Sequence, residues 1–204
     1  MHTDLTDVSD ATIVDGSLKV TQQQSHDHVK RGGVGWVSTE LHLHAAENWL
    51  DYSVSEIMAI GSATLFNLDR NKHNRMDVMS RNSLIDMKTC SITLQWLGLI
   101  ENTMPNYYNH PFFARKFGSL SQGQQKLLLI ASSIAQRPSL LILDEPCQGL
   151  DVWNRMHVLD LLQLLCENTD MALVYKTHHE EELIGGIDKA LRLESGKIVH
   201  CEQR

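Results

Sequence analysis

The sequence predicts an α/β domain in which a parallel, doubly wound sheet carries an inserted all-helical lobe. In the last third of the chain, short apolar runs alternate with segments of helical periodicity, which is typical of strands joined by crossover helices. Between about Asn48 and Gly118 the pattern is mostly helical and contains no repeat. We therefore expect the 204 residues to form one domain, with the α/β core in 1–47 and 136–204 and the helical lobe in 48–135.

The first half of the chain is expected to hold short strands and then helices. Ser17-Leu-Lys-Val20 is compatible with a short strand, and the Gln- and His-rich run after it is typical of a loop. Gly32 to Ser38 indicates a turn that enters a strand. Two apolar helix faces are expected in the lobe, one formed by Val54, Ile57 and Met58 and one within Thr93–Ile100.

A helix is predicted to begin after Ser121. Ser121 is a favourable N-cap, and Gln124 three residues later completes a capping box. Apolar residues then recur at the spacing i, i+3, i+4 and i+7, which predicts an amphipathic helix: Leu127, Ile130, Ala131 and Ile134. Pro138 lies beyond its expected end.

The remaining elements alternate between strand and helix. Leu140–Leu143 is a continuous apolar run, as expected for a buried parallel strand. Asp151 can cap the next helix, and Met171–Tyr175 is expected to be a second buried strand. The helix between them has the core stripe Val158, Leu161, Leu162 and Leu165. A hairpin is expected from 190–194 and 197–200.

Composition limits the function classes. The formal charge of −7 offers no basic footprint for nucleic acid, so we expect no nucleic-acid partner. No apolar run approaches the roughly 20 residues of a membrane-spanning helix, and residues 1–5 are no secretory signal, so a cytoplasmic location is expected. The four cysteines contain no C-x-x-C pair and are expected to be reduced thiols.

The 11 histidines include two closely spaced pairs, His26-Asp-His28 and His42-Leu-His44. Each pair could place two imidazoles on one side of a strand. No Cys or carboxylate completes a metal shell at ligand spacing, so surface histidines are the favoured interpretation and a metal site is the alternative.

Two adjacent carboxylates, Asp144 and Glu145, directly follow a predicted buried strand. Ligands of open α/β sheets bind at the carboxyl ends of the strands. One carboxylate there can hold Mg²⁺ through water, and the other can orient and activate an attacking water. The alternative is a strand that ends in an ordinary acidic turn.

Two further segments are suited to phosphate. Ser121 to Gln124 opens a helix, whose free N–H groups favour an anion; Gly123 permits close backbone approach, and the Ser121 hydroxyl can donate. His178 follows the second predicted strand, where an imidazole could reach a γ-phosphate. The alternatives are a plain helix cap and, for His178 and His179, a solvent-facing pair.

In this order and at this spacing, the motifs resemble the ATP-binding cassette (ABC) family from about Val34 to Glu194. Leu120–Gln124 resembles the signature motif, with Gln122 where glycine is commoner. The resemblance implies ATP and Mg²⁺ as ligands and assigns roles to four more residues: Asp144 as the Walker B aspartate, Glu145 as the catalytic glutamate, Asp151 as the D-loop aspartate and His178 as the switch histidine.

The sequences of Phe117–Gln125 and Glu145–Asp151 are most similar to the corresponding segments of tandem-cassette ATPases of molybdate transport. By this resemblance, the chain couples ATP hydrolysis to transport of a small anion. Its partners would be a second cassette, as a homodimer, heterodimer or tandem, and a membrane permease, with the chain peripheral at the inner membrane face. In the family, the signature serine and glycine contact the γ-phosphate held by the opposite subunit.

The sequence departs from the family pattern in three places. The phosphate-loop motif G-x-x-x-x-G-K-[ST] is absent, and so is the adenine-stacking aromatic residue that precedes it in the family. The Q-loop position holds Thr39, with Glu40 next, and Thr39 or Glu40 would have to take that role in the nucleotide site.

We therefore expect an N-terminally truncated cassette that lacks the first strand and phosphate loop of the P-loop NTPase fold. The isolated chain would be inactive as an ATPase and only marginally stable, because the sheet would lose a central strand. The alternatives are a non-catalytic degenerate cassette that serves as a regulatory interaction module, or a truncated remnant without its own function.

Overall fold

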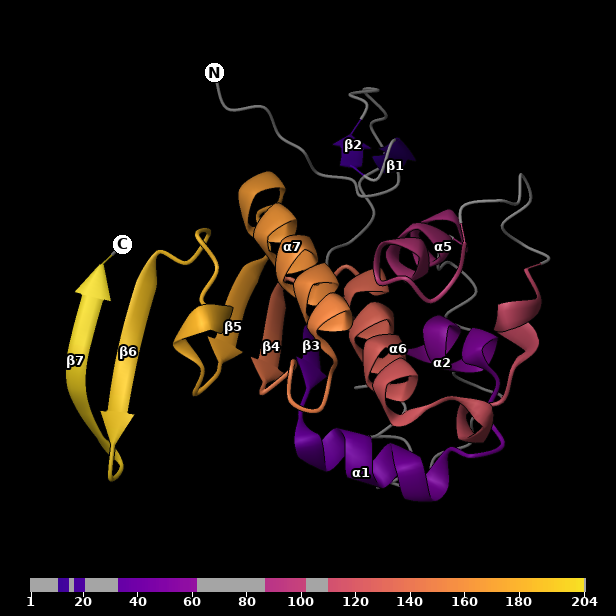
Figure 1. Cartoon of the computed structure of the whole chain (residues 1–204), viewed down its shortest axis with the longest axis horizontal. Helices are drawn as coiled ribbons and strands as arrows, with labels where there is room; N and C mark the ends of the chain where they lie inside the picture. Colours follow the sequence, from indigo (N-terminus) through magenta and orange to yellow (C-terminus); the bar gives the residue numbers. More distant parts are fainter. Residues whose placement is uncertain (1–10, 15–16, 21–32, 62–86, 102–109, 204) are drawn as a thin grey trace.

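The computed structural model describes residues 11–14, 17–20, 33–61, 87–101 and 110–203 (Figure 1). Near the N-terminus, β1 (Ala11–Val14) and β2 (Ser17–Val20) form an antiparallel hairpin, and the strand expected at Ser17–Val20 is confirmed. The histidine pair His26 and His28 and much of the predicted helical lobe lie outside the described residues.

The central sheet has three parallel strands in the order β3-β4-β5. They are β3 (Val34–Val37), β4 (Leu140–Asp144) and β5 (Ala172–Lys176). The register places Val37 opposite Leu143 and Asp144 opposite Lys176. The carboxyl ends of β4 and β5 therefore lie next to each other, so that residues following the two strands come together. The predicted parallel α/β sheet is confirmed.

Burial within this sheet differs from the expectation. In β4, Leu141 and Leu143 are buried and Leu140 and Ile142 are only partly buried, so that only one face is fully covered. The prediction of β5 as a buried strand is wrong, because none of its residues is buried and Val174 is 52% exposed. The reason is its place in the sheet: among the described strands it pairs with β4 alone and forms an edge.

Within the described residues, the first half of the chain contributes three helices: α1 (Thr39–Asn48), α2 (Val54–Ile60) and α5 (Met87–Trp96). Helix α1 begins ahead of the segment expected to be helical, because Ser38 caps it by accepting from Leu41 N–H. The apolar face expected for α2 is confirmed, since all three of its predicted residues are fully buried. In the second expected face, Leu94 and Leu97 are buried, although α5 ends between them.

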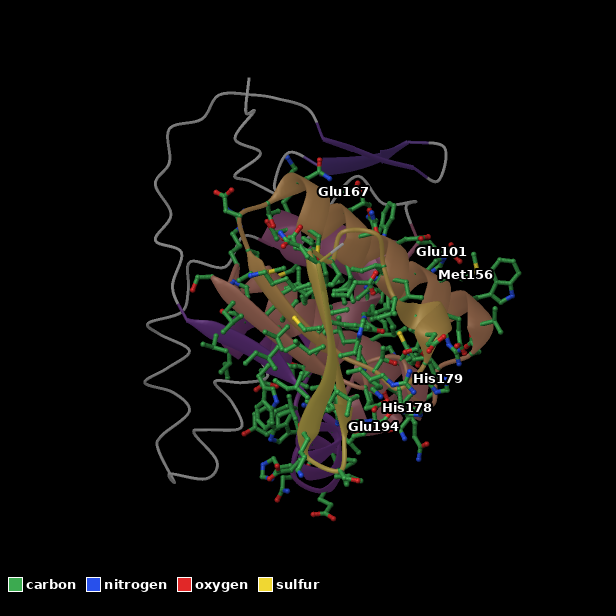
Figure 2. All side chains as sticks on the ribbon, turned by 90° about the vertical axis from the view of Figure 1, so that its left-hand side faces the viewer. Glu101, Met156, Glu167, His178, His179 and Glu194 are labelled. Atoms are coloured by element: carbon green, nitrogen blue, oxygen red, sulfur yellow. The ribbon has the colours of Figure 1, made fainter. Side chains whose placement is uncertain are left out.

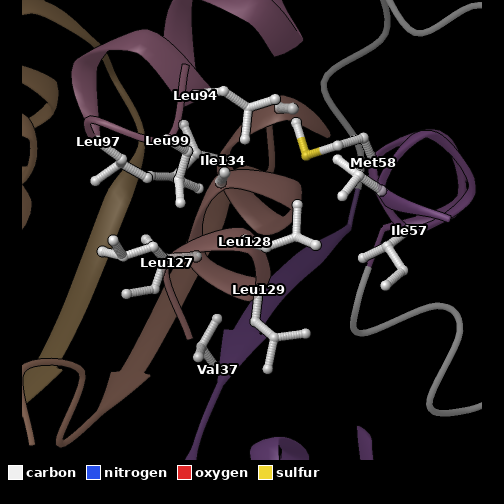
Figure 3. Packing of buried hydrophobic residues seen from close by; sticks show 14 of the residues in the cluster. Val37, Ile57, Met58, Leu94, Leu97, Leu99, Leu127, Leu128, Leu129 and Ile134 are labelled. Atoms are coloured by element: carbon white, nitrogen blue, oxygen red, sulfur yellow. The ribbon is translucent and has the colours of Figure 1, made fainter. Parts of the chain in front are cut away.

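Helix α6 (Gln122–Ala135) packs at the centre of the molecule. It begins with the predicted capping box of Ser121 and Gln124. Every side chain from Gln125 to Ala135 is buried, so the helix is covered all round rather than amphipathic. Figure 3 shows its leucines between Val37 of β3, Met58 of α2 and the Leu94 region of α5. These layers enclose it because α2, α5 and β3 all contact it.

Helix α7 (Val152–Asn168) lies between β4 and β5 in the chain and is capped by Asp151, as predicted. All four residues of its predicted stripe are buried. Its first turns also carry exposed apolar side chains, Val152, Trp153 and Met156. Three short 3-10 helices complete the described helical structure: η3 (Pro111–Ala114), η4 (Phe117–Ser119) and η5 (Glu180–Glu182).

The expected C-terminal hairpin is confirmed as β6 (Lys189–Glu194) and β7 (Lys197–Gln203), which pair antiparallel. It forms a sheet of its own beside β5 at the left of Figure 1. Four of its apolar side chains are exposed: Leu191, Leu193, Ile198 and Val199. No helix within the described ranges is both long and apolar enough to cross a membrane.

Candidate functional site

The candidate site begins where β4 ends. Asp144 is its last residue and Glu145 follows with φ of 53°, in the left-handed region that residues other than glycine seldom occupy. The Glu145 N–H donates to the Lys176 carbonyl at 2.9 Å, which extends the pairing with β5 by one step. The backbone bend directs the two neighbouring carboxylates to different partners.

The structure brings Glu145 and His178 together. The Nδ1 atom of His178 lies 2.7 Å from the Glu145 carboxylate, whose side chain is only 15% exposed, while the imidazole is 60% exposed. The rings of His178 and His179 lie 4.2 Å apart, and Figure 2 shows the two side chains next to each other. The exposed imidazole can donate a hydrogen bond to an anion, and the largely buried carboxylate beside it can accept a proton.

Asp144 pairs with a residue that the sequence analysis did not single out. The Lys176 ammonium lies 2.6 Å from Asp144 Oδ1, between the ends of neighbouring strands. The hydrogen bond and the negative charge of Asp144 raise the pKa of Lys176. Strand register predicts this contact once β4 and β5 are aligned, but the sequence alone does not give that register.

Ser121 to Gln124 form a closed capping box. The Ser121 hydroxyl accepts from the Gln124 N–H, and Gln124 Oε1 accepts from the Ser121 N–H, both at 3.2 Å. Gln122 begins the helix and is exposed, and a Cβ on Gly123 would lie 3.8 Å from Leu150, in ordinary contact. The Ser121 hydroxyl keeps its proton available for an incoming anion, because it serves only as an acceptor in the cap.

No hydrogen bond among the described residues joins this capping box directly to Glu145 or His178. The connection runs through Lys126, which is 4% exposed and donates to the carbonyls of Glu145 and Gln148 at 2.8 Å each. Burial lowers the pKa of Lys126, and the negative groups around it oppose that shift. The sequence analysis missed Lys126; its signal was a lysine inside a run of apolar helix positions.

Two other predicted residues lie around the same loop. Thr39 begins helix α1, and its hydroxyl is 3.4 Å from Gln148 Oε1. Asp151 accepts from the Asn154 N–H at 2.9 Å and from its amide at 2.6 Å, and the backbone hydrogen bond is the main cause that lowers the pKa of Asp151. Thr39 thus contacts the loop that links Glu145 to Asp151.

A buried polar cluster supports the loop from the other side. Glu182 is 2% exposed and accepts from the Thr177 hydroxyl at 2.7 Å and the Tyr175 hydroxyl at 3.2 Å. Arg155 Nε of α7 lies 3.6 Å from its carboxylate. The cluster anchors the end of β5, directly before His178, to α7.

Cys147 contacts this cluster, with its sulfur 3.9 Å from the Tyr175 hydroxyl. Burial, reinforced by the charge of Glu182, raises the pKa of Cys147 to about 11, and burial likewise raises the pKa of Tyr175. Both groups therefore stay neutral at ordinary pH. All four cysteines lie within the described residues, and none of them is in a disulfide, as expected.

The histidine pair His42 and His44 lies on helix α1, so the expectation of a strand is wrong there. His42 Nε2 lies 3.4 Å from Gln125 Oε1, and burial lowers the pKa of His42. Within the described ranges, no three His, Cys, Asp or Glu residues form a metal-binding group. Mg²⁺ needs no such group, because it usually keeps several waters and binds one or two carboxylates together with phosphates.

The model of the ABC transporter family matches residues 8–148. This chain belongs to the ABC transporter family. The matched range covers both the capping box at Ser121 and the carboxylates of Asp144 and Glu145. Cassettes of this family bind ATP with Mg²⁺ and work in pairs. The carboxylate oxygens of Asp144 and Glu145 are ligands of the type that Mg²⁺ prefers.

Individual relatives match over part of their length. The chain is 39% identical over 90 residues to the molybdate import ATP-binding protein MolC of Haemophilus influenzae, covering 44% of this chain and 36% of MolC. It is 38% identical over 92 residues to the thiamine import ATP-binding protein ThiQ of the same organism, covering 45% and 43%. The chain thus matches less than half the length of each.

The fold agrees with the family. A dimeric structure of MJ0796, a bacterial ABC transporter cassette, superposes with a TM-score of 0.57 at 20% identity, covering 86% of this chain and 64% of that chain. At this identity the likeness shows the fold alone. The α/β architecture with a parallel sheet is therefore that of an ABC cassette.

Proposed function

We propose that this chain is part of an ABC ATPase that couples ATP binding and hydrolysis to the import of a small anion, with molybdate as the candidate. The contact of 2.7 Å between His178 and the Glu145 carboxylate carries the proposal. It places a carboxylate that can activate water beside an imidazole that can bind a γ-phosphate. We further propose the division into a core of 1–47 and 136–204 and a helical subdomain of 48–135.

Each motif has one role in this proposal. Glu145 takes the proton of the attacking water, and His178 holds the γ-phosphate. Asp144 would hold Mg²⁺ through water, and the ion would neutralise phosphate charge. Thr39 and Asp151 flank the loop that carries Glu145, through the contact with Gln148 and through the cap of α7.

The phosphate loop of this site comes from outside the 204 residues, because the sequence contains no G-x-x-x-x-G-K-[ST]. That loop supplies charge-assisted hydrogen bonds worth about 1.5–3 kcal/mol each, so ATP would bind weakly without it. The chain in turn offers Ser121, Gln122, Gly123 and Gln124 to the γ-phosphate held by a second cassette. The α6 N-terminus supports this, since its exposed residues leave N–H groups at a positive dipole end.

The cargo is proposed from resemblance to relatives. MolC is named for molybdate import and ThiQ for thiamine import, at nearly equal identity. We favour the anion because the stretch from Phe117 to Gln125 and that from Glu145 to Asp151 resemble molybdate-type cassettes. A permease would then be the membrane partner, and the chain would lie on the cytoplasmic side of the membrane.

The test has two steps. Calorimetric titration of the purified chain with Mg-ATP is expected to give no binding below millimolar concentration. Mixed with a second cassette that has an intact phosphate loop, the chain is expected to raise ATP turnover. Ser121→Ala should then lower that turnover at least tenfold, while the matched variant Ser119→Ala, at an exposed serine two residues earlier, leaves it unchanged.

Equal turnover with Ser121→Ala and with the unmodified chain would contradict the role of the capping box in trans. Micromolar Mg-ATP binding by the chain alone would contradict the need for an external loop. Glu145→Gln serves as the companion variant, because it keeps the shape of the side chain and removes the base.

A specific observation favours a second candidate, a non-catalytic cassette that acts as an interaction module. Lys176 occupies Asp144 Oδ1 at 2.6 Å and cancels charge at the proposed Mg²⁺ carboxylate. If this is the function, the mixture with a second cassette forms a stable complex whose turnover is insensitive to Glu145→Gln and to Ser121→Ala alike.

A further inference from the structure

The ammonium group of Lys126 lies where helix α6 meets the loop after β4. Its Nζ donates to the carbonyl oxygens of Glu145 and Gln148, at 2.8 Å each. These two residues delimit one tight turn, because the Gln148 N–H also donates to the Glu145 carbonyl at 3.2 Å. A single cation therefore closes both ends of the turn that carries the carboxylate.

The turn needs such an external hold. Glu145 keeps a φ of 53°, which an L-residue adopts only when its surroundings enforce it. The Glu145 N–H is held by the Lys176 carbonyl, and the carbonyl on the other side of the same residue is held by Lys126. The N–H and the carbonyl of Glu145 are thus both held in place, and its carboxylate is directed at His178.

A buried ammonium is costly unless its donors are satisfied, and a leucine or methionine would fill the same space without that cost. Lys126 is 4% exposed and follows Gln125 in a helix whose next nine residues are all buried. Packing alone does not require a charge there. The ammonium instead donates to two carbonyl oxygens, which an apolar side chain cannot do.

We propose that Lys126 is a positioning residue for Glu145. Its ammonium holds the turn from Glu145 to Gln148 in the bent form and joins that turn to the helix whose N-terminus presents Ser121. The proposal rests on the proposed function in one respect, namely that Glu145 is the carboxylate that activates water.

Amide hydrogen exchange measured residue by residue tests this without nucleotide, so the result is independent of whether the chain binds ATP. Lys126→Met preserves the side-chain volume and removes the donors. We expect the amides of Gln148 and Leu150 to exchange at least tenfold faster, while amides of α6 between Ala131 and Ala135 change less than threefold.

Two variants separate hydrogen bonding from packing. Lys126→Arg is expected to restore most of the protection, because a guanidinium can donate to two carbonyls at once. Lys189→Met, at an exposed lysine of β6, is the matched control and should leave every amide of the turn unchanged. Unchanged exchange at Gln148 in Lys126→Met would overturn the proposal, and so would an increase spread evenly over α6 and β4.

If Lys126→Met does not fold, the unmodified chain decides. Lysine labelled with ¹⁵N at Nζ should then show one slowly exchanging ammonium, with couplings across hydrogen bonds to the carbonyl carbons of Glu145 and Gln148. Exchange of every lysine ammonium at the rate of free lysine would overturn the proposal. Turnover with a second cassette that is insensitive to Ser121→Ala and to Glu145→Gln, alongside a protected turn, would count against the proposed function only.

Discussion

Lys176 and Asp144 stand directly opposite each other in the last register position of β4 and β5, with the ammonium 2.6 Å from Oδ1. The pair places a positive charge at the carboxylate proposed for Mg²⁺. If the proposed Mg²⁺ site forms here, its cation affinity would depend on Lys176 as well as on Asp144 and Glu145.

Lys176→Met is expected to raise the affinity of the chain for Mn²⁺, used as a paramagnetic probe for Mg²⁺, by roughly threefold to tenfold. A unit charge a few ångströms away has an effect of this order near a protein surface. Line broadening in NMR spectra at residues around Asp144 measures it. Lys189→Met is the control, and equal broadening in the two variants would show that the ammonium does not compete with the cation.

Glu182→Ala is expected to lower the free energy of unfolding by about 2–3 kcal/mol. The change leaves two hydroxyls and Arg155 without their buried acceptor, and the estimate is reduced because Arg155 is about a third exposed. Urea unfolding measures the loss. Glu181→Ala, at an exposed neighbour, should have no measurable effect, and equal loss in both variants would argue against the buried cluster.

Alkaline pH is expected to destabilise the fold through Cys147. Burial raises the pKa of its thiol from 9.0 to about 11, so between these values the folded chain keeps a proton that the unfolded chain has lost. Stability must then fall as pH rises from 9 to 11, by about 2–3 kcal/mol at most for a shift of this size.

Chemical unfolding at pH 8, 9, 10 and 11 checks this slope. Cys147→Ala is expected to flatten it between pH 9 and 10, below the range in which Tyr175, whose pKa is also raised, contributes, whereas Cys201→Ala, at an exposed cysteine, should not. A thiol reagent at pH 8 should label Cys201 rapidly and Cys147 only on unfolding. Rapid labelling of Cys147 in the folded chain would refute the assigned burial.

The purified chain is expected to self-associate as its concentration rises. Val174 on the edge strand β5 and the apolar side chains of β6 and β7 are exposed, and an open edge with apolar neighbours favours pairing. Val174→Lys should shift sedimentation toward the monomer. Val152→Lys, at a still more exposed valine on α7, is the control, and a monomer at all concentrations would contradict this prediction.

Sequence patterns predicted most of the local structure, because the signals were local. The capping box at Ser121, the cap at Asp151 and the stripe of α7 depend on spacings of three or four residues. The start of α1 was missed, since Ser38 was taken as the end of a strand rather than as an N-cap. The prediction that β5 is buried was wrong, because an apolar run does not reveal whether other elements pack against it.

The candidate site was predicted only in part. The strand ends that position Glu145 and His178 were predicted, but the contact between the two side chains was not, because it depends on the alignment of β4 with β5. Lys126, Lys176 and Glu182 were missed because each acts on a residue at least five positions away along the chain. Such partners become visible only when register and helix packing are known.

The enclosure of helix α6 from Gln125 to Ala135 has a mechanical consequence. With neighbours on all sides, the helix has no free face along which it could roll or slide without opening gaps in the core. A displacement of its N-terminus at Ser121 would therefore move α6 as a rigid body, together with the packed helices α2 and α5. Through its two hydrogen bonds, Lys126 would pass the same displacement to the turn at Glu145. In the proposed function, phosphate binding at Ser121 would therefore change the position of the Glu145 carboxylate.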